Sequence, residues 1–123
     1  MTHIGIDIIE IDRVEKAIAR WGDGFLHRVY TDAELKLCDG RVPSLAGRFA
    51  AKEAAIKALS GDGAGLFLKD IEILTETSGK PVAYLYGKAR KLADQSGLTS
   101  LTVSLSHSRE NAVAVAIGED RII

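Results

Sequence analysis

The residues with the clearest chemical potential lie in one apolar stretch near the middle of the chain. Lys52, Glu53 and Lys57 interrupt residues 44–59, which are otherwise rich in alanine and large aliphatic side chains. Lys52 falls within an apolar stripe of helical spacing, formed by Leu45, Phe49, Ile56 and Leu59. A helix that is apolar nearly all round is expected to be buried, so its ionised groups must be paired, wetted by a cleft or bound to a ligand. An i,i+4 ion pair between Glu53 and Lys57 is the simplest such pairing.

A second isolated carboxylate, Asp7, lies in an apolar run near the N-terminus. Residues 4–11 are mostly β-branched and predict a strand with two buried faces. Taken alone, Asp7 is a strand-edge or capping carboxylate. Taken with Glu53, it supplies two hard oxygen donors on separate elements, a sparse set that holds Mg²⁺ when substrate phosphates and waters complete the coordination. Lysines on the same helix would neutralise those phosphates.

A histidine and a row of basic residues have two interpretations each. His107 follows a predicted strand and is flanked by Ser106 and Ser108. It is either a turn histidine bonded to the local backbone or part of a phosphate-facing cluster. A second feature is a basic stripe along a predicted helix, made of Arg13, Lys16 and Arg20. The stripe is either a solvated helix face or a surface for an acidic partner.

Several classes of site and partner are not supported by the sequence. The segment GDGAG lacks the Lys-Ser/Thr of a P-loop, no Gly-x-Ser-x-Gly elbow is present, and no thiol or imidazole cluster suits zinc. A net charge of −1 gives no global field for nucleic acid. The first apolar run is too short to span a membrane, and the single cysteine, Cys38, cannot form an intramolecular disulfide. We therefore expect a cytoplasmic protein with neither a membrane nor a nucleic-acid partner.

The elements that must position these residues fit one domain over residues 1–123. Helices are expected over about 12–21, 31–38, 44–59 and 87–96, and strands over 4–11, 71–77, 82–86, 101–106 and 112–117. Capping boxes are predicted at Asp12 with Glu15 and at Thr31 with Glu34. The order predicts an α+β fold in which a largely antiparallel sheet packs against a long buried helix. Because so small a domain supports one modest core, partner subunits would complete any deep cleft.

Three segments in this order, GIDIIEIDR, RFAAKEAAIKAL and SLSHS, resemble the holo-(acyl-carrier-protein) synthase family of phosphopantetheinyl transferases. The resemblance spans nearly the whole chain. It implies Mg²⁺-dependent transfer of the phosphopantetheine arm from coenzyme A to a serine of apo acyl carrier protein, with release of adenosine 3′,5′-bisphosphate, in fatty acid biosynthesis. It also implies a homotrimer with active sites between subunits. The chain departs from the family at SGDGAG, which does not match the family's Gly-Thr-Gly loop.

The resemblance assigns the central chemistry to three residues. Asp7 and Glu53 would be the metal ligands, and Lys57 would contact the coenzyme A diphosphate. All three would be catalytic. The sequence does not identify the base that takes the serine proton: Glu53, directly or through a water, is the first choice, and Asp32 or Glu34 is the alternative.

The remaining roles concern the coenzyme and the carrier protein. By resemblance, Arg48 and Lys52 would be anion contacts for the coenzyme, and His107 would lie near the nucleotide phosphates. Arg13, with the rest of the basic stripe, would contact the acidic recognition helix of the carrier protein.

Two functions from other classes remain open on the same residues. A Mg²⁺-dependent nucleotide or diphosphate hydrolase would use the carboxylates and lysines but transfer to water. A non-catalytic module that binds acidic carrier proteins would need the basic stripe but not Glu53.

Overall fold

The computed structural model describes residues 1–60 and 65–120, so most of the Gly-rich SGDGAG segment lies outside the described residues. The elements follow the chain as β1 (Thr2–Glu10), α1 (Ile11–Trp21), α2 (Asp23–Val29), α3 (Asp32–Cys38), α4 (Val42–Ser60), the 3₁₀ turn η1 (Leu68–Asp70), β2 (Ile71–Thr75), β3 (Pro81–Leu85), α5 (Gly87–Gln95), β4 (Leu98–His107) and β5 (Asn111–Asp120).

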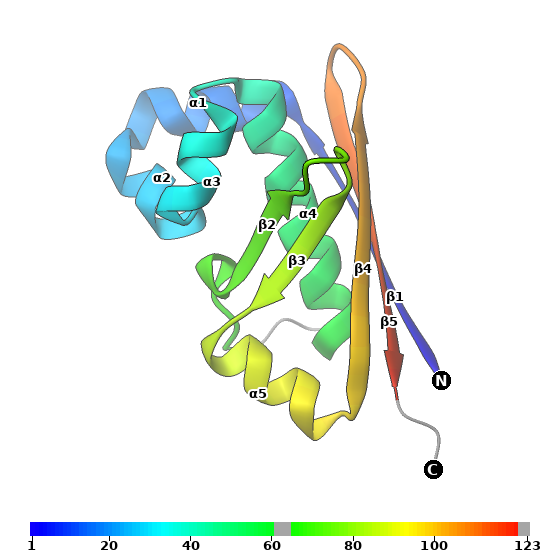
Figure 1. Cartoon of the computed structure of the whole chain (residues 1–123). Helices are drawn as coiled ribbons and strands as arrows, with labels where there is room; N and C mark the ends of the chain where they lie inside the picture. Colours follow the sequence, from blue (N-terminus) through cyan, green and yellow to red (C-terminus); the bar gives the residue numbers. More distant parts are fainter. Residues whose placement is uncertain (61–64, 121–123) are drawn as a thin grey trace.

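Two antiparallel sheets lie on either side of α4. The larger sheet has the strand order β1-β5-β4, and the smaller one is the β2-β3 hairpin. Figure 1 shows α4 between them, with β1, β4 and β5 along one side of the molecule and α1, α2 and α3 grouped at one end. The predicted α+β class, the antiparallel sheets and the hairpin through residues 78–81 are confirmed.

The core is built around α4, as its uniformly apolar sequence predicts. Alanines at positions 50, 51, 54 and 55 are fully buried, and they pack with Ile71, Ile73, Val103 and Ala116 from both sheets. Alanine side chains let neighbouring backbones come close, and the closest approach is at Gly5 of β1. A Cβ atom at Gly5 would collide with the backbone carbonyl oxygen of Ala54. Only glycine therefore permits β1 to lie this close to α4.

The N-terminal helices differ from the sequence prediction in two places. Helix α1 starts at Ile11, directly after β1, and Glu10 at its N-cap makes no side-chain capping bond. The predicted capping box at Asp12 is therefore wrong: Asp12 lies inside the helix and forms an ion pair with Lys16 at 2.8 Å. Residues 23–29, for which neither a helix nor a strand was predicted, form α2. The capping box of α3 is confirmed, with Thr31 and Glu34 bonded reciprocally.

The prediction that β1 has two buried faces is wrong for a single protomer. Gly5 faces α4 and is buried, whereas Ile4, Ile6 and Ile8 on the other face are 64%, 61% and 65% exposed. In the sheet register these isoleucines lie opposite Ile117, Val115 and Val113 of β5. We call these six side chains the outer sheet face. A β-branched strand predicts burial on both sides, but one side of β1 is exposed in the protomer.

The remaining differences concern element ends. Helix α4 starts at Val42, β4 and β5 extend further than the apolar alternation indicated, and β2 and β3 end earlier than predicted. No helix among the described residues is long and apolar enough to cross a membrane.

The close approach of β1 to α4 gives a stability prediction. Gly5→Ala should destabilise the fold by about 1–3 kcal/mol, because the added methyl group must displace β1 from the α4 backbone. Gly24→Ala is the matched control, since a Cβ at exposed Gly24 meets nothing within 4 Å. That variant should be as stable as the parent or more stable by up to about 1 kcal/mol. Urea unfolding of both variants checks the prediction, and equal stabilities would contradict it.

Candidate functional site

The contact between β1 and α4 brings three of the predicted site residues together. Lys57, on α4, extends its ammonium group across to β1, where Nζ donates to the carbonyl oxygen of Ile6 at 2.9 Å and to Asp7 Oδ1 at 3.3 Å. The Asp7 side chain is 19% exposed and that of Lys57 is 50% exposed. Asp7 alternates in β1 with the outward-facing isoleucines, so it projects toward α4. The ammonium group is thus held at the surface with one carboxylate beside it.

Glu53 lies one helical turn before Lys57 and interacts with Asp7. Burial raises the pKa of the Glu53 carboxyl above its ordinary value of 4.5, the nearby Asp7 charge raises it further, and Lys57 acts in the opposite direction. Two carboxylates from distant parts of the sequence therefore share one electrostatic environment within a single protomer. The simplest prediction was an ion pair between Glu53 and Lys57. Lys57 instead forms its ion pair with Asp7, at 3.3 Å.

The donor set fits a hard divalent cation. Asp7 and Glu53 supply carboxylate oxygens, which Mg²⁺ prefers, and their mutual repulsion favours a cation between them. Across residues 1–60 and 65–120, no group of three or more His, Cys, Asp or Glu side chains could hold a metal ion. The remaining coordination positions would therefore be left to water and to substrate oxygens, the arrangement by which Mg²⁺ usually binds phosphate substrates.

Lys52 has an internal role, which corrects the expectation that it contacts a coenzyme anion. Its side chain is fully buried, and Nζ donates to Glu34 Oε1 at 2.7 Å, to the Leu68 carbonyl at 3.0 Å and to the Ile71 carbonyl at 2.5 Å. An ammonium has three donors, so none is left for a phosphate. Burial lowers the pKa of Lys52, and the Glu34 carboxylate opposes that change.

Glu34 is as buried as Lys52, which removes it as a candidate base. Its Oε1 also accepts the Thr31 backbone N–H at 2.9 Å, and its Oε2 accepts the Ile73 backbone N–H at 2.8 Å. A carboxylate enclosed in this way cannot meet an incoming hydroxyl group. Asp32, the other alternative base, is fully exposed beside His27.

Arg48 is largely occupied by contacts within the protomer. The side chain is 8% exposed, Nη1 donates to Ser44 Oγ at 3.2 Å, and Nη2 donates to Thr75 Oγ1 at 2.8 Å. Its Nε is buried and has no hydrogen-bond partner among the described residues. The guanidinium therefore links α4 to the end of β2 and keeps one donor unused.

His107 and the basic stripe lie apart from the carboxylates. His107 is exposed at the end of β4, and its Nδ1 lies 3.2 Å from the carbonyl oxygen of Ser108. This is the local backbone contact expected of a turn histidine. On α1, Arg13 is exposed and its side chain forms no hydrogen bond or ion pair within the described part of the chain, whereas Lys16 pairs with Asp12 and the Arg20 guanidinium lies 5.0 Å from the centre of the Trp21 ring.

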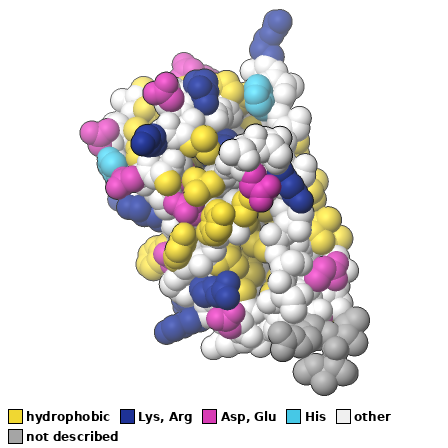
Figure 2. All heavy atoms as spheres, viewed as in Figure 1, with side chains coloured by type: hydrophobic (Ala, Val, Ile, Leu, Met, Phe, Trp, Pro, Cys, Tyr) yellow, Lys and Arg dark blue, Asp and Glu magenta, His cyan; other side chains and the backbone are white. Residues whose placement is uncertain are grey.

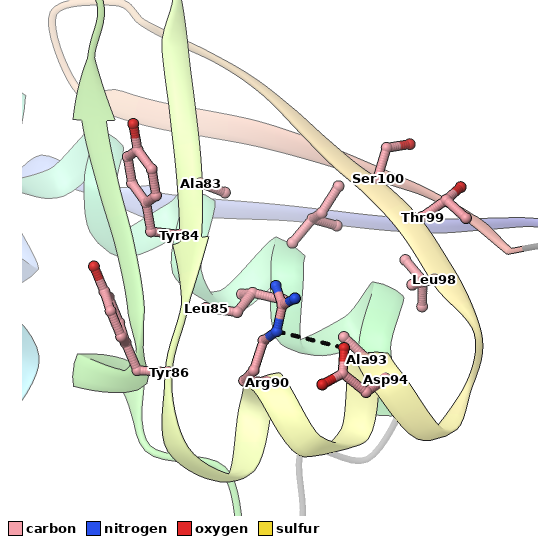
Figure 3. Close-up of a pocket in the computed structure, with 11 residues that line it drawn as sticks. Ala83, Tyr84, Leu85, Tyr86, Arg90, Ala93, Asp94, Leu98, Thr99 and Ser100 are labelled. Atoms are coloured by element: carbon pink, nitrogen blue, oxygen red, sulfur yellow. Dashed lines mark ion pairs between the residues drawn. The ribbon is translucent and has the colours of Figure 1, made fainter.

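A pocket of about 310 Å³ lies elsewhere, between β3, α5 and the start of β4. Figure 3 shows Tyr84 and Tyr86 on its β3 side and the Arg90–Asp94 ion pair on its α5 side. None of the predicted site residues lines it. Asp7, Glu53 and Lys57 therefore lie outside this pocket.

Sequence reasoning missed the roles of two residues next to the candidate site and in the core beneath it. Gly5 sets the distance between β1 and α4, and a glycine within a run of isoleucines was the available signal for a close backbone approach. Glu34 was recognised as a capping residue but not as the counter-ion of Lys52. Nothing local connects two residues that are 18 positions apart on different helices.

The raised pKa of Glu53 predicts a pH-dependent stability in the absence of divalent ions. The folded state keeps the Glu53 proton to higher pH than the unfolded state does, so stability should fall as pH rises from about 4.5 through the raised pKa. Glu53→Gln should flatten this slope and stabilise the fold at neutral pH. Urea unfolding across pH 4–8 in chelator measures the effect, and an unchanged slope in Glu53→Gln would contradict it.

Known proteins resemble this chain over nearly its whole length. Residues 3–116 match the family model described as the 4′-phosphopantetheinyl transferase superfamily. The chain is 50% identical over 120 residues to the holo-(acyl-carrier-protein) synthase of Dehalococcoides mccartyi strain CBDB1, covering 98% of this chain and 100% of that one. It is 47% identical to the synthase of Syntrophus aciditrophicus, covering 97% of each chain.

A solved structure agrees with the sequence matches. The crystal structure of the Helicobacter pylori synthase in complex with coenzyme A superimposes with a TM-score of 0.86 at 37% identity, covering 94% of this chain and 99% of that one. The family match spans nearly all of the described fold, including β1 with Asp7 and α4 with Glu53 and Lys57. The chain belongs to the 4′-phosphopantetheinyl transferase superfamily.

Proposed function

We propose that this protein is a holo-(acyl-carrier-protein) synthase, which transfers the phosphopantetheine arm of coenzyme A to a serine of apo acyl carrier protein for fatty acid biosynthesis. The observation that carries the proposal is the convergence of Asp7, Glu53 and Lys57 where β1 meets α4, in a chain half identical to proteins of that name. Two carboxylates and a lysine at a surface suit a diphosphate substrate.

The chain's residues divide the chemistry as follows. Asp7 and Glu53 would hold Mg²⁺, which when bound would supply a Lewis acid for the coenzyme A diphosphate. Lys57 exchanges part of its contact with Asp7 for the diphosphate oxygens. The serine hydroxyl attacks the phosphorus on the pantetheine side, and the bond from that phosphorus to the leaving adenosine 3′,5′-bisphosphate breaks. Glu53, directly or through a water, takes the serine proton. Positioning and electrostatics supply most of the rate.

The rest of the coenzyme would extend toward the other basic residues. Arg48 keeps one buried unpaired donor and has part of its guanidinium near Thr75, and His107 carries an exposed ring at the end of β4. We propose that these two side chains meet the nucleotide phosphates once a neighbouring protomer completes the cleft.

The carrier protein would dock on the basic stripe of α1. Arg13 offers an exposed guanidinium that pairs with no carboxylate among the described residues, whereas Asp12 partly neutralises Lys16. Beyond Arg20 the stripe leads to a pocket of about 290 Å³ lined by Trp21, Gly24, Phe25 and Arg28. An acidic helix that also carries an apolar side chain fits this combination of charge and aromatic surface.

The outer sheet face supports the proposed homotrimer. Its three isoleucines are each more than 60% exposed, and Figure 2 shows hydrophobic side chains along the edge where β1 and β5 lie. A continuous β-branched surface of this kind is the usual mark of a subunit interface. The interface would lie on the opposite face of β1 from Asp7. The buried single thiol, Cys38, fits the reducing cytoplasm, where we place the protein.

The proposed transfer can be tested by weighing the carrier protein. Incubation of the protein with coenzyme A, Mg²⁺ and apo acyl carrier protein should add the mass of one phosphopantetheine arm to the carrier. Glu53→Ala should remain folded and lose at least about a hundredfold of kcat, because it removes a metal ligand and the base together. Breakdown of coenzyme A with an unmodified carrier would indicate a hydrolase instead. Carrier binding without either reaction would indicate a non-catalytic module.

The docking surface can be tested by charge reversal. Arg13→Glu should raise KM for the carrier about tenfold or more with little change in the affinity for coenzyme A, because an acidic helix would then meet a like charge. Lys91→Glu on α5 makes the same charge change at an exposed position far from α1 (Figure 1) and should leave KM unchanged. Equal losses in both variants would exclude a local docking role for Arg13.

The trimer can be tested on the outer sheet face. Ile6→Lys should convert trimers to monomers, because it would bury a charge at the interface. Phe67→Lys introduces the same charge at an exposed apolar side chain outside this face and should leave the mass unchanged. Sedimentation equilibrium measures both variants. A parent protein that is monomeric at micromolar concentration would contradict the proposed assembly.

A further inference from the structure

Half of the buried residues of α4 are alanines, so side-chain packing restrains the rotation of the helix less than a core of large side chains would. These alanines are at positions 46, 50, 51, 54, 55 and 58. Cores built from near-identical small side chains allow several packings of similar energy. The contact of Gly5 with the backbone at Ala54 and Ala58 restrains the side of the helix that faces β1. A specific polar contact on another side would complete the selection of the rotation that directs Glu53 and Lys57 toward Asp7.

Lys52 provides a contact that does fix rotation. Its Nζ is bonded to acceptors on three separate segments: Glu34 of α3, the Leu68 carbonyl of η1 and the Ile71 carbonyl at the start of β2. Three acceptors around one ammonium define a point in space. Because Lys52 precedes Glu53 by one residue, fixing its end also fixes the angle at which Glu53 leaves the helix, about 100° further round.

The acceptor side is itself held firmly. Glu34 is fixed by the backbone N–H groups of Thr31 and Ile73. Thr31 Oγ1 in turn donates to Glu72 Oε2 at 2.6 Å, and the Tyr86 hydroxyl donates to Glu72 Oε1 at 3.1 Å. The network therefore ties α3, β2 and the residue before α5 to a single position on α4.

Stability alone does not account for this pair. Both side chains have zero exposed surface, and desolvating two charges costs about as much as their attraction returns. Apolar residues of the same volume would often stabilise such a position equally well. In proteins where a role for a buried ion pair has been demonstrated, the best-supported role is to select one structural arrangement over its alternatives.

We propose that Lys52 and Glu34 are positioning residues for the transfer reaction: the ion pair sets the rotation of α4 and so brings the Glu53 carboxylate against Asp7. The inference rests on the proposed function, since the measured reaction is the phosphopantetheine transfer. Neither residue touches the substrate. Partners one step removed from a metal site commonly change metal affinity or activity by about 10–100-fold when they are altered.

The test replaces the pair by a neutral one of similar shape, Lys52→Met with Glu34→Gln. The double variant should fold, lose about 10–100-fold in kcat, keep the parent KM for the carrier, and bind Mn²⁺ about tenfold more weakly in the presence of coenzyme A, as followed by electron paramagnetic resonance. Val103→Ala is the control, because Val103 is a buried β4 residue of the same core with no part in the network. At a temperature where it is folded, that variant should keep the parent kcat and Mn²⁺ affinity.

The results of this test distinguish a failure of the proposed function from a failure of the positioning role. If the parent protein transfers no arm, the proposed function fails. If the parent is active and the folded double variant keeps full kcat and Mn²⁺ affinity, the positioning role is wrong. Equal losses in the double variant and Val103→Ala would also overturn it. Should the double variant not fold, Lys52→Arg keeps the charge but cannot direct its planar fork at the same three acceptors. That variant should lose about tenfold in kcat, and full activity would overturn the inference.

Discussion

The close contact between Gly5 of β1 and the backbone of α4 at Ala54 is the constraint on which the site depends. A side chain at position 5 would push the strand away from the helix, and the carboxylate two residues further along the strand would move with it. The contact is possible because α4 presents alanines to both sheets. The fold therefore uses small residues on both sides to bring a strand and a helix together, and it places the charged residues just beyond the point of closest approach.

Burial of α4 has a second consequence, since its four ionisable residues face different surroundings. Arg48 donates to Ser44 and Thr75. Lys52 faces the interior and is neutralised by Glu34, Glu53 is half-buried beside Asp7, and Lys57 reaches the surface. One charged side chain of an apolar helix can thus form a buried structural ion pair, while its neighbours along the helix lie at the candidate site. The sequence shows that the charges need partners, and the sheets on either side of the helix decide which partners they meet.

Much of the fold could be predicted because its signals are local. The uniformly apolar α4, the Thr31–Glu34 capping box and the β2-β3 hairpin all depend on neighbouring residues, and all were confirmed. The exposed isoleucines of β1 were misjudged because the alternation of a strand cannot distinguish a core from a subunit interface. The start of α1 was misplaced because β1 runs into the helix without the cap that Asp12 seemed to supply.

The site could be predicted only in part, for a related reason. Asp7, Glu53 and Lys57 were identified because a charge in an apolar element must have a function or a partner, and the family motifs support the same three residues. The partner of Lys52 could not be predicted: its three acceptors come from α3, η1 and β2, and only the folded chain brings them together. Gly5 was missed as well: a glycine in a strand can mark a close backbone approach, but the local sequence does not tell which helix approaches.

The central claim is that Asp7 and Glu53 share one divalent cation within a protomer. Crystals grown with Mn²⁺ and coenzyme A provide the most direct measurement, through the anomalous scattering of the metal. The account predicts one strong peak within bonding distance of both carboxylates and of a diphosphate oxygen. A peak bound by only one of these carboxylates, or located away from the contact between β1 and α4, would contradict it.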